Sequence, residues 1–391
     1  MPEKPTYSPT CDGALQIGLV STFPPKLCGL ATFANALKTG LRNDGHRVLV
    51  VRLDEESSAE ATLDLHPVSA RMVNGDAASI RTASALLSRC DVAIIQHEYG
   101  IYGGADGQEV IDLMRHISSP TIVVLHTVPS HPSAHQRSLL VQIGEMANRL
   151  VVMSTAARSR LVELYPIDES KVVTIPHGAA VAPAETAATR DARSPQLLTW
   201  GLLGPGKGIE HTIEALGMLD DLTPHVRYTV AGVTHPKVLL RDGDRYRRSL
   251  VARAHECGVA DTVSFDDTYR DVVQLNRFVA SASVVVLPYD SHDQVTSGVL
   301  VDAIAAGRPV IATAFPHAVE LLAGGAGILV PHEDTAALAA AIRTVLTEPG
   351  VRDAMAAEAR QLAPSLSWDA VASTYAALGN ELRYAQQPVA I

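Results

Sequence analysis

The sequence predicts an α/β protein built from two doubly wound, parallel-sheet domains. Three observations support this: short apolar runs alternate with amphipathic stretches, the alternation stops once at residues 181–196, and it then resumes. Runs of four to seven residues rich in Val and Ile are typical of parallel strands that are buried on both faces. Such strands, alternating with helices, indicate doubly wound sheets.

The first domain is expected over residues 1–180. Its predicted strands are Leu15–Ser21, Arg47–Leu53, Val92–His97, Thr121–His126, Leu150–Ser154 and Val172–Pro176. The stretches between them have helical periodicity. Examples are Phe33–Arg42, Ala78–Arg89, Gln108–His116 and Gln136–Asn148.

Residues 181–196 are rich in Ala, Thr, Pro and charge without apolar periodicity, which predicts a linker. The second domain is expected over 197–368, with strands at Leu197–Gly201, Tyr228–Gly232, Val263–Phe265, Val284–Pro288, Pro309–Thr313 and Gly327–Val330. Its predicted helices include Ile209–Leu219, Val299–Ala306 and Thr335–Leu346. An apolar stripe predicts a final helix near 369–386, and packing back on the first domain is one of its two possible arrangements.

Composition narrows the class of protein. Of the 391 residues, 47% are hydrophobic and 19% are charged, as in globular proteins, and the net charge of −10 disfavours a broad nucleic-acid-binding face. Four scattered cysteines without a CxxC pair favour free thiols in a reducing compartment. The first residues lack an apolar signal-peptide core, and no apolar run reaches membrane-spanning length. We therefore expect a cytoplasmic protein with no transmembrane segment and no nucleic-acid partner.

The segment Gly201–Gly208, GLLGPGKG, fits the phosphate-binding pattern GxxxxGK[ST] except at its last position. That position supplies a hydroxyl to Mg²⁺ in nucleotide triphosphatases, so Gly208 argues against this class. Lys207 is still expected to open a helix, where backbone N–H groups and the Lys charge favour a phosphate. The alternative is a solvated loop lysine.

Asp242 and Asp244 have the DxD spacing that holds a divalent metal under a nucleotide diphosphate in some enzymes. Metal sites of this kind need carboxylates that converge on a ligand. Here the pair lies in the highly charged stretch RDGDRYRR, and Asp244 is expected to begin or cap a helix instead. No metal site is predicted.

Other candidates follow the predicted strands of the first domain. No GxGxxG follows the first strand, which disfavours a dinucleotide oxidoreductase; instead Gly29 ends a loop that contains two prolines. His97 and His126 fall at strand carboxyl ends, the edge where ligands bind in open α/β sheets. For His97 the structural interpretation is preferred, and for His126 both interpretations stay open. His131 lies in the same loop as His126.

The loop after Pro288 is the richest in polar residues. Ser297 is a natural helix N-cap, and Gly298 leaves the first backbone amides of the helix open to a phosphate. Asp302 lies in the first turn or so, where its carboxylate can accept hydrogen bonds from sugar hydroxyls. Its alternative role is a favourable interaction with the helix dipole.

In order and spacing, these motifs resemble the retaining glycosyltransferases of family 4, which have the GT-B fold and use nucleotide-diphosphate sugars. The resemblance covers nearly the whole chain. It implies two Rossmann-like domains facing across a cleft, the first on the acceptor side and the second on the donor side. The matching residues are Pro24-Pro25 with Gly29, His126, Ile175–Gly178, Gly201 with Lys207-Gly208, Gln294 to Asp302, Gly307–Ile311 and Ser367-Trp368.

The resemblance implies roles for individual residues. Gly29 would line the donor diphosphate, His126 would lie beside the transferred sugar, and Lys207 would contact the diphosphate. His126 and Lys207 are thus the expected catalytic residues. The expected donor-binding residues are Gly29, Lys207, Gln294, Ser297, Gly298, Val299 and Asp302.

Two positions depart from the family pattern. The family signature Glu-x7-Glu appears as Gln294-x7-Asp302, so the first carboxylate, which contacts the donor sugar, is an amide here. Asp302 can still accept ribose hydroxyls. Leu202 occupies a position at which many members have an Arg that assists the Lys. Positive charge on the leaving diphosphate is therefore reduced to Lys207 and helix amides.

The resulting hypothesis is a retaining, metal-independent transfer of a hexose from a nucleotide-diphosphate sugar, with no cofactor. No carboxylate nucleophile stands out, consistent with same-face attack by the acceptor. Two alternatives stay open: a non-catalytic nucleotide-sugar-binding relative, favoured by Gln294 and Leu202, or a GT-B phosphorylase or epimerase. The sequence does not indicate the base, the sugar, the acceptor (saccharide, lipid or small molecule) or the oligomeric state.

Overall fold

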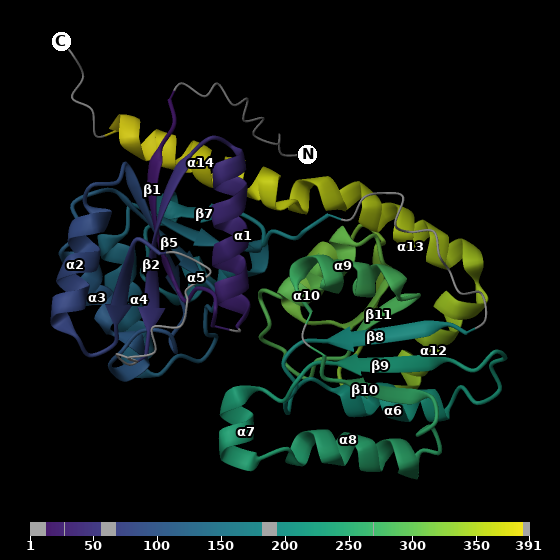
Figure 1. Cartoon of the computed structure of the whole chain (residues 1–391). Helices are drawn as coiled ribbons and strands as arrows, with labels where there is room; N and C mark the ends of the chain where they lie inside the picture. Colours follow the sequence, from purple (N-terminus) through teal and green to yellow (C-terminus); the bar gives the residue numbers. More distant parts are fainter. Residues whose placement is uncertain (1–12, 27, 56–67, 182–193, 269, 386–391) are drawn as a thin grey trace. The chain divides into compact units, whose positions relative to one another are not determined.

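The computed structural model describes residues 13–26, 28–55, 68–181, 194–268 and 270–385. The chain forms two compact units (Figure 1): unit 1 contains Met1–Gly178 and Trp368–Ile391, and unit 2 contains Ala179–Ser367. The sequence placed the two domains at 1–180 and 197–368. Of the predicted linker, residues 182–193 lie outside the described parts.

Unit 1 is built on a seven-stranded parallel sheet with the order β3-β2-β1-β4-β5-β6-β7. The strands are β1 Gln16–Ser21, β2 Arg47–Asp54, β3 Ala70–Val73, β4 Val92–His97, β5 Thr121–Leu125, β6 Arg149–Val152 and β7 Val172–Thr174. The central strands β4 and β5 are buried along their whole length. This explains why they are continuous apolar runs in the sequence.

Helices cover both faces of this sheet. On one face, α1 (Gly29–Asn43) and α14 (Trp368–Ala385) share a hydrophobic core with β1, β4 and β5. On the other face, α2 (Ala77–Leu87) places Leu87 where a Cβ on Gly18 of β1 would lie. The remaining α-helices of unit 1 are α3 Glu109–Arg115, α4 Ala134–Met146 and α5 Thr155–Leu164.

Unit 2 repeats the architecture with six parallel strands in the order β10-β9-β8-β11-β12-β13. They are β8 Gln196–Trp200, β9 Arg227–Ala231, β10 Val263–Asp266, β11 Val284–Leu287, β12 Val310–Thr313 and β13 Gly327–Val330. Its α-helices are α6 Ile209–Gly217, α7 Pro236–Asp242, α8 Arg245–Glu256, α9 Val272–Ser281, α10 Gly298–Ala305, α11 Pro316–Leu321, α12 Thr335–Thr347 and α13 Pro349–Leu362.

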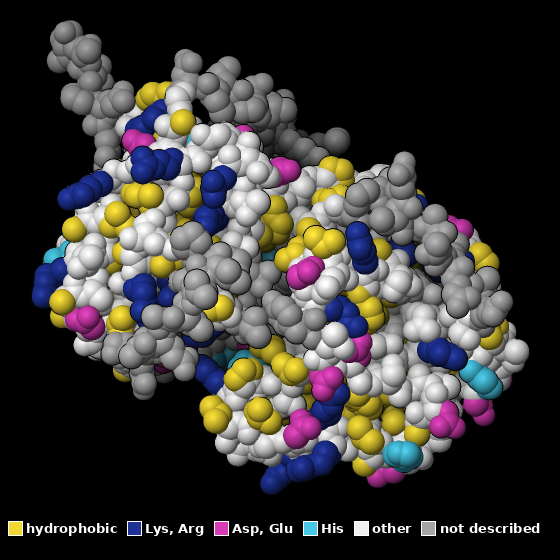
Figure 2. All heavy atoms as spheres, viewed as in Figure 1, with side chains coloured by type: hydrophobic (Ala, Val, Ile, Leu, Met, Phe, Trp, Pro, Cys, Tyr) yellow, Lys and Arg dark blue, Asp and Glu magenta, His cyan; other side chains and the backbone are white. Residues whose placement is uncertain are grey.

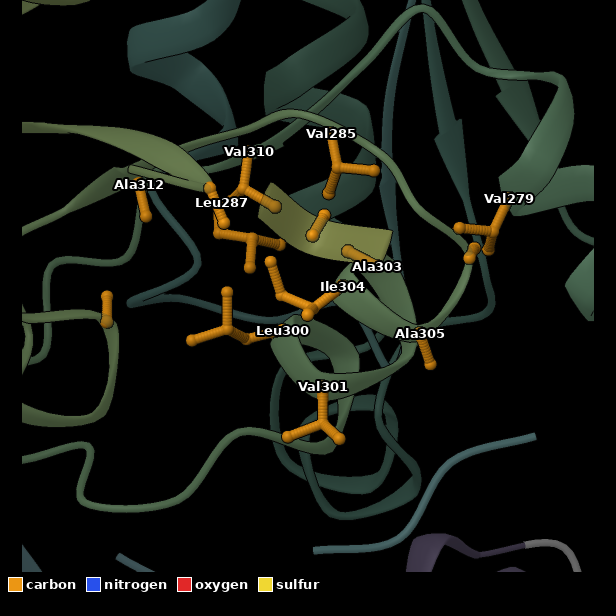
Figure 3. Packing of buried hydrophobic residues seen from close by; sticks show 14 of the residues in the cluster. Val279, Val285, Leu287, Leu300, Val301, Ala303, Ile304, Ala305, Val310 and Ala312 are labelled. Atoms are coloured by element: carbon orange, nitrogen blue, oxygen red, sulfur yellow. The ribbon is translucent and has the colours of Figure 1, made fainter. Parts of the chain in front are cut away.

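The helix α10 packs through its apolar side chains against the central strands of unit 2. Figure 3 shows Leu300 and Ile304 of this helix directed toward Val285, Leu287 and Val310 of β11 and β12. All five side chains are fully buried. This packing holds the first residues of α10, which belong to the candidate site, in a fixed position.

The predicted fold class, an α/β protein with two doubly wound parallel sheets, is confirmed. All twelve predicted strands are present, with ends within one or two residues of the prediction, and the sequence missed β3. This strand has four residues at the edge of the sheet and pairs only with β2, so it needs no long apolar run.

On the face drawn in Figure 2, Lys and Arg side chains are interspersed with Asp and Glu. None of the helices in the described ranges is both long and apolar enough to cross a bilayer. Cys28, Cys90 and Cys257 are free thiols, and Cys11 lies outside the described residues.

Candidate functional site

The candidate donor residues of unit 2 lie on two loops, 201–208 after β8 and 288–297 after β11. The two loops contact each other, because the backbone N–H of Asp290 donates to the carbonyl of Gly206 at 3.1 Å. Gly208 is left-handed, with φ of 60°, and a Cβ there would lie 1.8 Å from the Pro288 carbonyl oxygen. A Ser or Thr, as the triphosphatase pattern requires, therefore does not fit at this position.

Lys207 lies two residues before α6, which begins at Ile209, where the sequence predicted the start of this helix. Its Nζ atom stands 4.5 Å from the ring centroid of Tyr289, a cation–π contact. Burial lowers the pKa of Lys207. No carboxylate within the described ranges forms an ion pair with it, so its charge is available to an anionic ligand.

Tyr289 was not singled out in the sequence, yet it organises this loop. Its ring is buried and stacks on Phe315 at 5.2 Å, and burial raises its pKa to about 12. Its carbonyl accepts hydrogen bonds from the Thr313 hydroxyl at 2.6 Å and from the His332 ring at 2.9 Å. The aromatic surface beneath Lys207 is therefore fixed by neighbouring strands.

The beginning of α10 forms as the sequence predicted. The Ser297 hydroxyl accepts from the N–H of Leu300 at 3.3 Å, and its own N–H donates to Nδ1 of buried His317 at 2.9 Å. Among the described residues, the backbone N–H groups of Gly298 and Val299 have no acceptor, as expected for the first turn of a helix. They are free to bind an anion.

Asp302 is the fifth residue of α10, just after its first turn, which agrees with the prediction. The described part of the chain gives its carboxylate no hydrogen-bond or ion-pair partner, and burial raises its pKa to about 7. An unpartnered, desolvated carboxylate gains most from a ligand that donates hydrogen bonds.

Gln294 has a local role that the sequence did not predict. Its side-chain Nε2 donates to the carbonyl of Thr296, within its own loop. The amide therefore stabilises the loop conformation in addition to any contact with a ligand.

Arg308 of the Gly307–Ile311 motif has a structural role. Its side chain is buried and donates to the carbonyls of Ala280 and Ala282.

Asp242 and Asp244 do not converge. Asp242 pairs with the exposed Arg241 at 2.7 Å, and Asp244 accepts from the Thr234 hydroxyl. Asp244 precedes α8 at the N-cap position, but its side chain makes no capping hydrogen bond. The prediction that Asp244 begins or caps the following helix is confirmed, with Asp244 at the N-cap position.

In unit 1, Phe33 of α1 is the centre of a cluster of rings. It makes edge-to-face contacts with His126, His177 and Trp368 at centroid distances of 4.9, 5.0 and 4.9 Å. A Cβ on Gly178 would lie 2.4 Å from the Trp368 ring, so this motif glycine allows the close approach. Three segments of the family pattern thus meet at Phe33, which the sequence analysis placed on a helix but did not single out as a site residue.

Gly29 is the first residue of α1, and a Cβ on it would meet open space. The N-cap before it is Cys28, whose sulfur accepts from the N–H of Ala31 at 3.4 Å. A ligand therefore has room to approach the backbone of Gly29.

The three histidines of the sequence analysis differ in their environment. Nε2 of His126 lies 2.5 Å from Oε1 of Gln96, and burial, with His177 and His97 nearby, lowers the pKa of His126 to about 3. His97 is fully buried with both ring nitrogens unpartnered, and its pKa is lowered to about 4. His131 is exposed and contacts the Ser130 hydroxyl at 2.9 Å.

Comparisons with known proteins agree with this arrangement. Residues 28–182 match the family described as Glycosyltransferase Family 4, and residues 185–362 match Glycosyl transferases group 1. A D-inositol 3-phosphate glycosyltransferase of Kineococcus radiotolerans is 32% identical over 258 residues, covering 59% of this chain and 56% of the relative. A glycogen synthase of Mycobacterium tuberculosis is 29% identical over 233 residues, covering 59% and 53%.

The aligned part thus spans little more than half the length of these relatives. Among solved structures, the Anabaena protein Alr3699/HepE, crystallised with UDP and glucose, has a TM-score of 0.74 at 17% identity, over 94% of this chain and 100% of that one. This likeness shows the fold. The chain belongs to the glycosyltransferases, with a family 4 amino-terminal domain, a group 1 carboxyl-terminal domain and the GT-B fold.

Proposed function

We propose that this glycosyltransferase moves a hexosyl group from a nucleoside diphosphate sugar to an acceptor hydroxyl, with retention of anomeric configuration and without a metal ion. The observation that carries the proposal is Lys207. It is a partly buried lysine with no acidic partner in the described ranges, held over Tyr289 on a loop that contacts the 288–297 loop leading into α10.

In the proposed reaction, the bond between the anomeric carbon and the diphosphate oxygen breaks, and a bond to the acceptor oxygen forms on the same face. The acceptor proton leaves with the diphosphate. Negative charge develops on the leaving group, so positive charge and N–H donors fixed in advance stabilise the transition state. Lys207 and the free N–H groups of Gly298 and Val299 are suited to this role.

The remaining donor contacts follow from the same loops. Asp302, whose carboxylate lacks a partner within the described residues, would accept hydrogen bonds from the ribose hydroxyls. Gln294 would contact the sugar through an amide, which both donates and accepts. In unit 1, Gly29 would line the diphosphate and His126 would lie beside the transferred sugar.

The comparisons support a nucleoside diphosphate sugar as the class of donor. The Anabaena relative was crystallised with UDP-glucose as well as with UDP and glucose, and the Kineococcus relative is named for D-inositol 3-phosphate. Metal independence is supported by Asp242 and Asp244, whose carboxylates are engaged by Arg241 and Thr234.

A panel of nucleotide sugars tests the proposal through release of the nucleoside diphosphate, with and without EDTA, and through the anomeric configuration of the product by NMR. Lys207→Ala should weaken binding of the nucleoside diphosphate by about 1.5–3 kcal/mol, the range for charge-assisted hydrogen bonds. Lys237→Ala, an exposed lysine of the same unit, is the control and should bind normally. Equal affinity of Lys207→Ala and wild type by calorimetry removes Lys207 from the site.

A non-catalytic nucleotide-sugar-binding protein is the second candidate, because Leu202 and Gln294 replace charged residues of the family pattern. Slow hydrolysis of a bound donor decides between the two, since a pure binding protein leaves the donor intact. A phosphorylase would instead release a sugar 1-phosphate when free phosphate is added.

A further inference from the structure

Gln96 is a polar residue at the end of an otherwise apolar strand. It lies on β4, its side chain is fully buried, and by alternation it shares the sheet face of Val92 and Ile94. This face also carries Phe33 of α1. A buried amide is costly unless it makes specific hydrogen bonds, so its partner is informative.

That partner is His126, at the carboxyl end of the neighbouring strand β5. Oε1 of Gln96 and Nε2 of His126 are 2.5 Å apart, while the N–H of His126 donates to the His97 carbonyl at 3.0 Å. Oε1 of Gln96 faces the ring in this structure, while Nε2 of Gln96 has no partner among the described residues. A carbonyl oxygen only accepts hydrogen bonds, so this orientation of the amide assigns the ring proton to Nε2 of His126. In the neutral ring, Nδ1 then holds a lone pair.

The surroundings of His126 favour this neutral ring. The edge-to-face contact with Phe33 fixes its plane, and the titratable groups that act on it are His97 and His177, neither of which is an acid. Burial lowers its pKa to about 3. Among the described residues Nδ1 has no hydrogen-bond partner, and unlike the ring nitrogens of His97 it is not sealed from solvent.

We propose that Gln96 is a positioning residue that holds His126 in its Nε2–H tautomer, so that Nδ1 accepts a hydrogen bond from a hydroxyl group of the bound sugar. The inference rests on the proposed function for the placement of the sugar beside His126. It assigns a role to Gln96, which no family motif named above includes, and it requires that the sugar hydroxyl at this place acts as the donor.

The choice of an amide is important. A carboxylate at position 96 would attract a second proton to His126, and the imidazolium has no lone pair to offer. Gln96→Glu should therefore make His126 an imidazolium that can only donate hydrogen bonds. Gln96→Leu should leave the ring neutral but populate both of its tautomers. These two variants fail in different ways, which a purely structural role of Gln96 would not produce.

NMR of the full chain with ¹⁵N-labelled histidine reads the tautomer directly, with His126→Asn to assign the signals. Wild type should show Nε2–H at pH 7, Gln96→Leu a mixture of tautomers, and Gln96→Glu an imidazolium. Thr121→Val is the matched control: its buried hydroxyl is also unpartnered, but it lies at the opposite end of β5, and the variant should keep the wild-type signals. An Nδ1–H ring in wild type overturns the proposal, even if every variant fails to fold.

Kinetics give the second readout. Gln96→Leu should lower kcat by about tenfold, the rate equivalent of one hydrogen bond made in the transition state, with KM for the donor nearly unchanged. At saturating donor, where Asp302 stays ionised in the complex, kcat of Gln96→Glu should rise with pH, while kcat of wild type stays flat from pH 6 to 8. Wild-type kcat in Gln96→Leu overturns the role of Gln96. An Nε2–H ring in a protein that turns over no nucleotide sugar supports the tautomer assignment and refutes the proposed function instead.

Discussion

Asp302 should make the free energy of unfolding fall as pH rises, which is the opposite of the usual effect of a carboxylate. Burial raises its pKa to about 7, above the value of about 3.9 in an unfolded chain. The folded state therefore retains the proton between these pH values, and stability falls as pH rises through this window. We expect Asp302→Asn to melt like wild type at pH 4 and at a higher temperature than wild type at pH 8. A lower melting temperature for the variant at pH 8 would contradict the predicted environment.

The same carboxylate should report donor binding. If ribose hydroxyls donate to the ionised form, binding lowers the pKa of Asp302 and releases its proton. Calorimetry with UDP-glucose at pH 6, in buffers of different ionisation enthalpy, should show proton release by wild type and none by Asp302→Asn. UDP-glucose is preferable to UDP because its phosphodiester groups do not titrate in this range.

Gln294 is expected to select the sugar and to affect the nucleotide little. An amide accepts from one hydroxyl and donates to another, so a site built around it discriminates against sugars that leave one group unpaired. Gln294→Ala should lower turnover sharply, while affinity for the free nucleoside diphosphate stays within about twofold. Gln294→Glu should change donor preference more than total activity. Unchanged turnover and donor preference in Gln294→Ala would show that this loop is wrongly aligned with the family signature.

Some residues of the candidate site could be predicted from the sequence and others could not. Lys207, Ser297 and Asp302 were predicted because each follows a strand at a position with recognisable chemistry. Gln96 was missed, although a polar residue ending a buried strand, on the same face as Val92 and Ile94, was a usable signal. Phe33 and Tyr289 were missed because an apolar ring in a core looks the same whether or not a polar group rests on it.

At the scale of elements, the loop 201–208 depends on the absence of one side chain. Gly206 and Gly208 both have positive φ, but a Cβ at Gly206 meets open space and one at Gly208 lies 1.8 Å from the Pro288 carbonyl oxygen. Gly206→Ala should cost about 1–2 kcal/mol of unfolding free energy, the strain of a left-handed residue. Gly208→Ala should cost about 1–3 kcal/mol more, because backbone must move. Equal losses in urea unfolding would argue against the tight contact.

Strands that form continuous apolar runs were predictable from the sequence, and the edge strand β3 was not. The strands β4, β5 and β11 are buried on both faces, so their composition alone identified them. In contrast, β3 is short and half exposed, and its pairing with β2 is a long-range contact that no local pattern encodes. Loop conformation is equally non-local: the Pro288 carbonyl requires a glycine at position 208, and no local sequence pattern shows this contact.

At the scale of the whole molecule, α14 makes unit 1 depend on both ends of the chain. Its buried side chains Val371, Tyr375, Leu378 and Leu382 belong to the core formed by α1 and the strands of unit 1. The two hydrophobic cores described for unit 2 contain no residue of this helix. The sequence predicted the helix from its apolar stripe but left its partner open, because a stripe shows which face is buried and not what covers it.

This division predicts that the two units unfold separately and respond to different changes. Tyr375 is fully buried, so Tyr375→Ala should cost unit 1 about 3–5 kcal/mol, as for other large aromatic truncations. Tyr384→Ala, half exposed on the same helix, is the control and should cost little. UDP should instead raise the transition of unit 2 more than that of unit 1, because Lys207 and Asp302 lie in unit 2 and only Gly29 of unit 1 is expected to line the diphosphate. A ligand stabilises the folded state that binds it. Calorimetric scans of Tyr375→Ala with and without UDP measure both effects, and a single transition that both changes shift equally would contradict this independence.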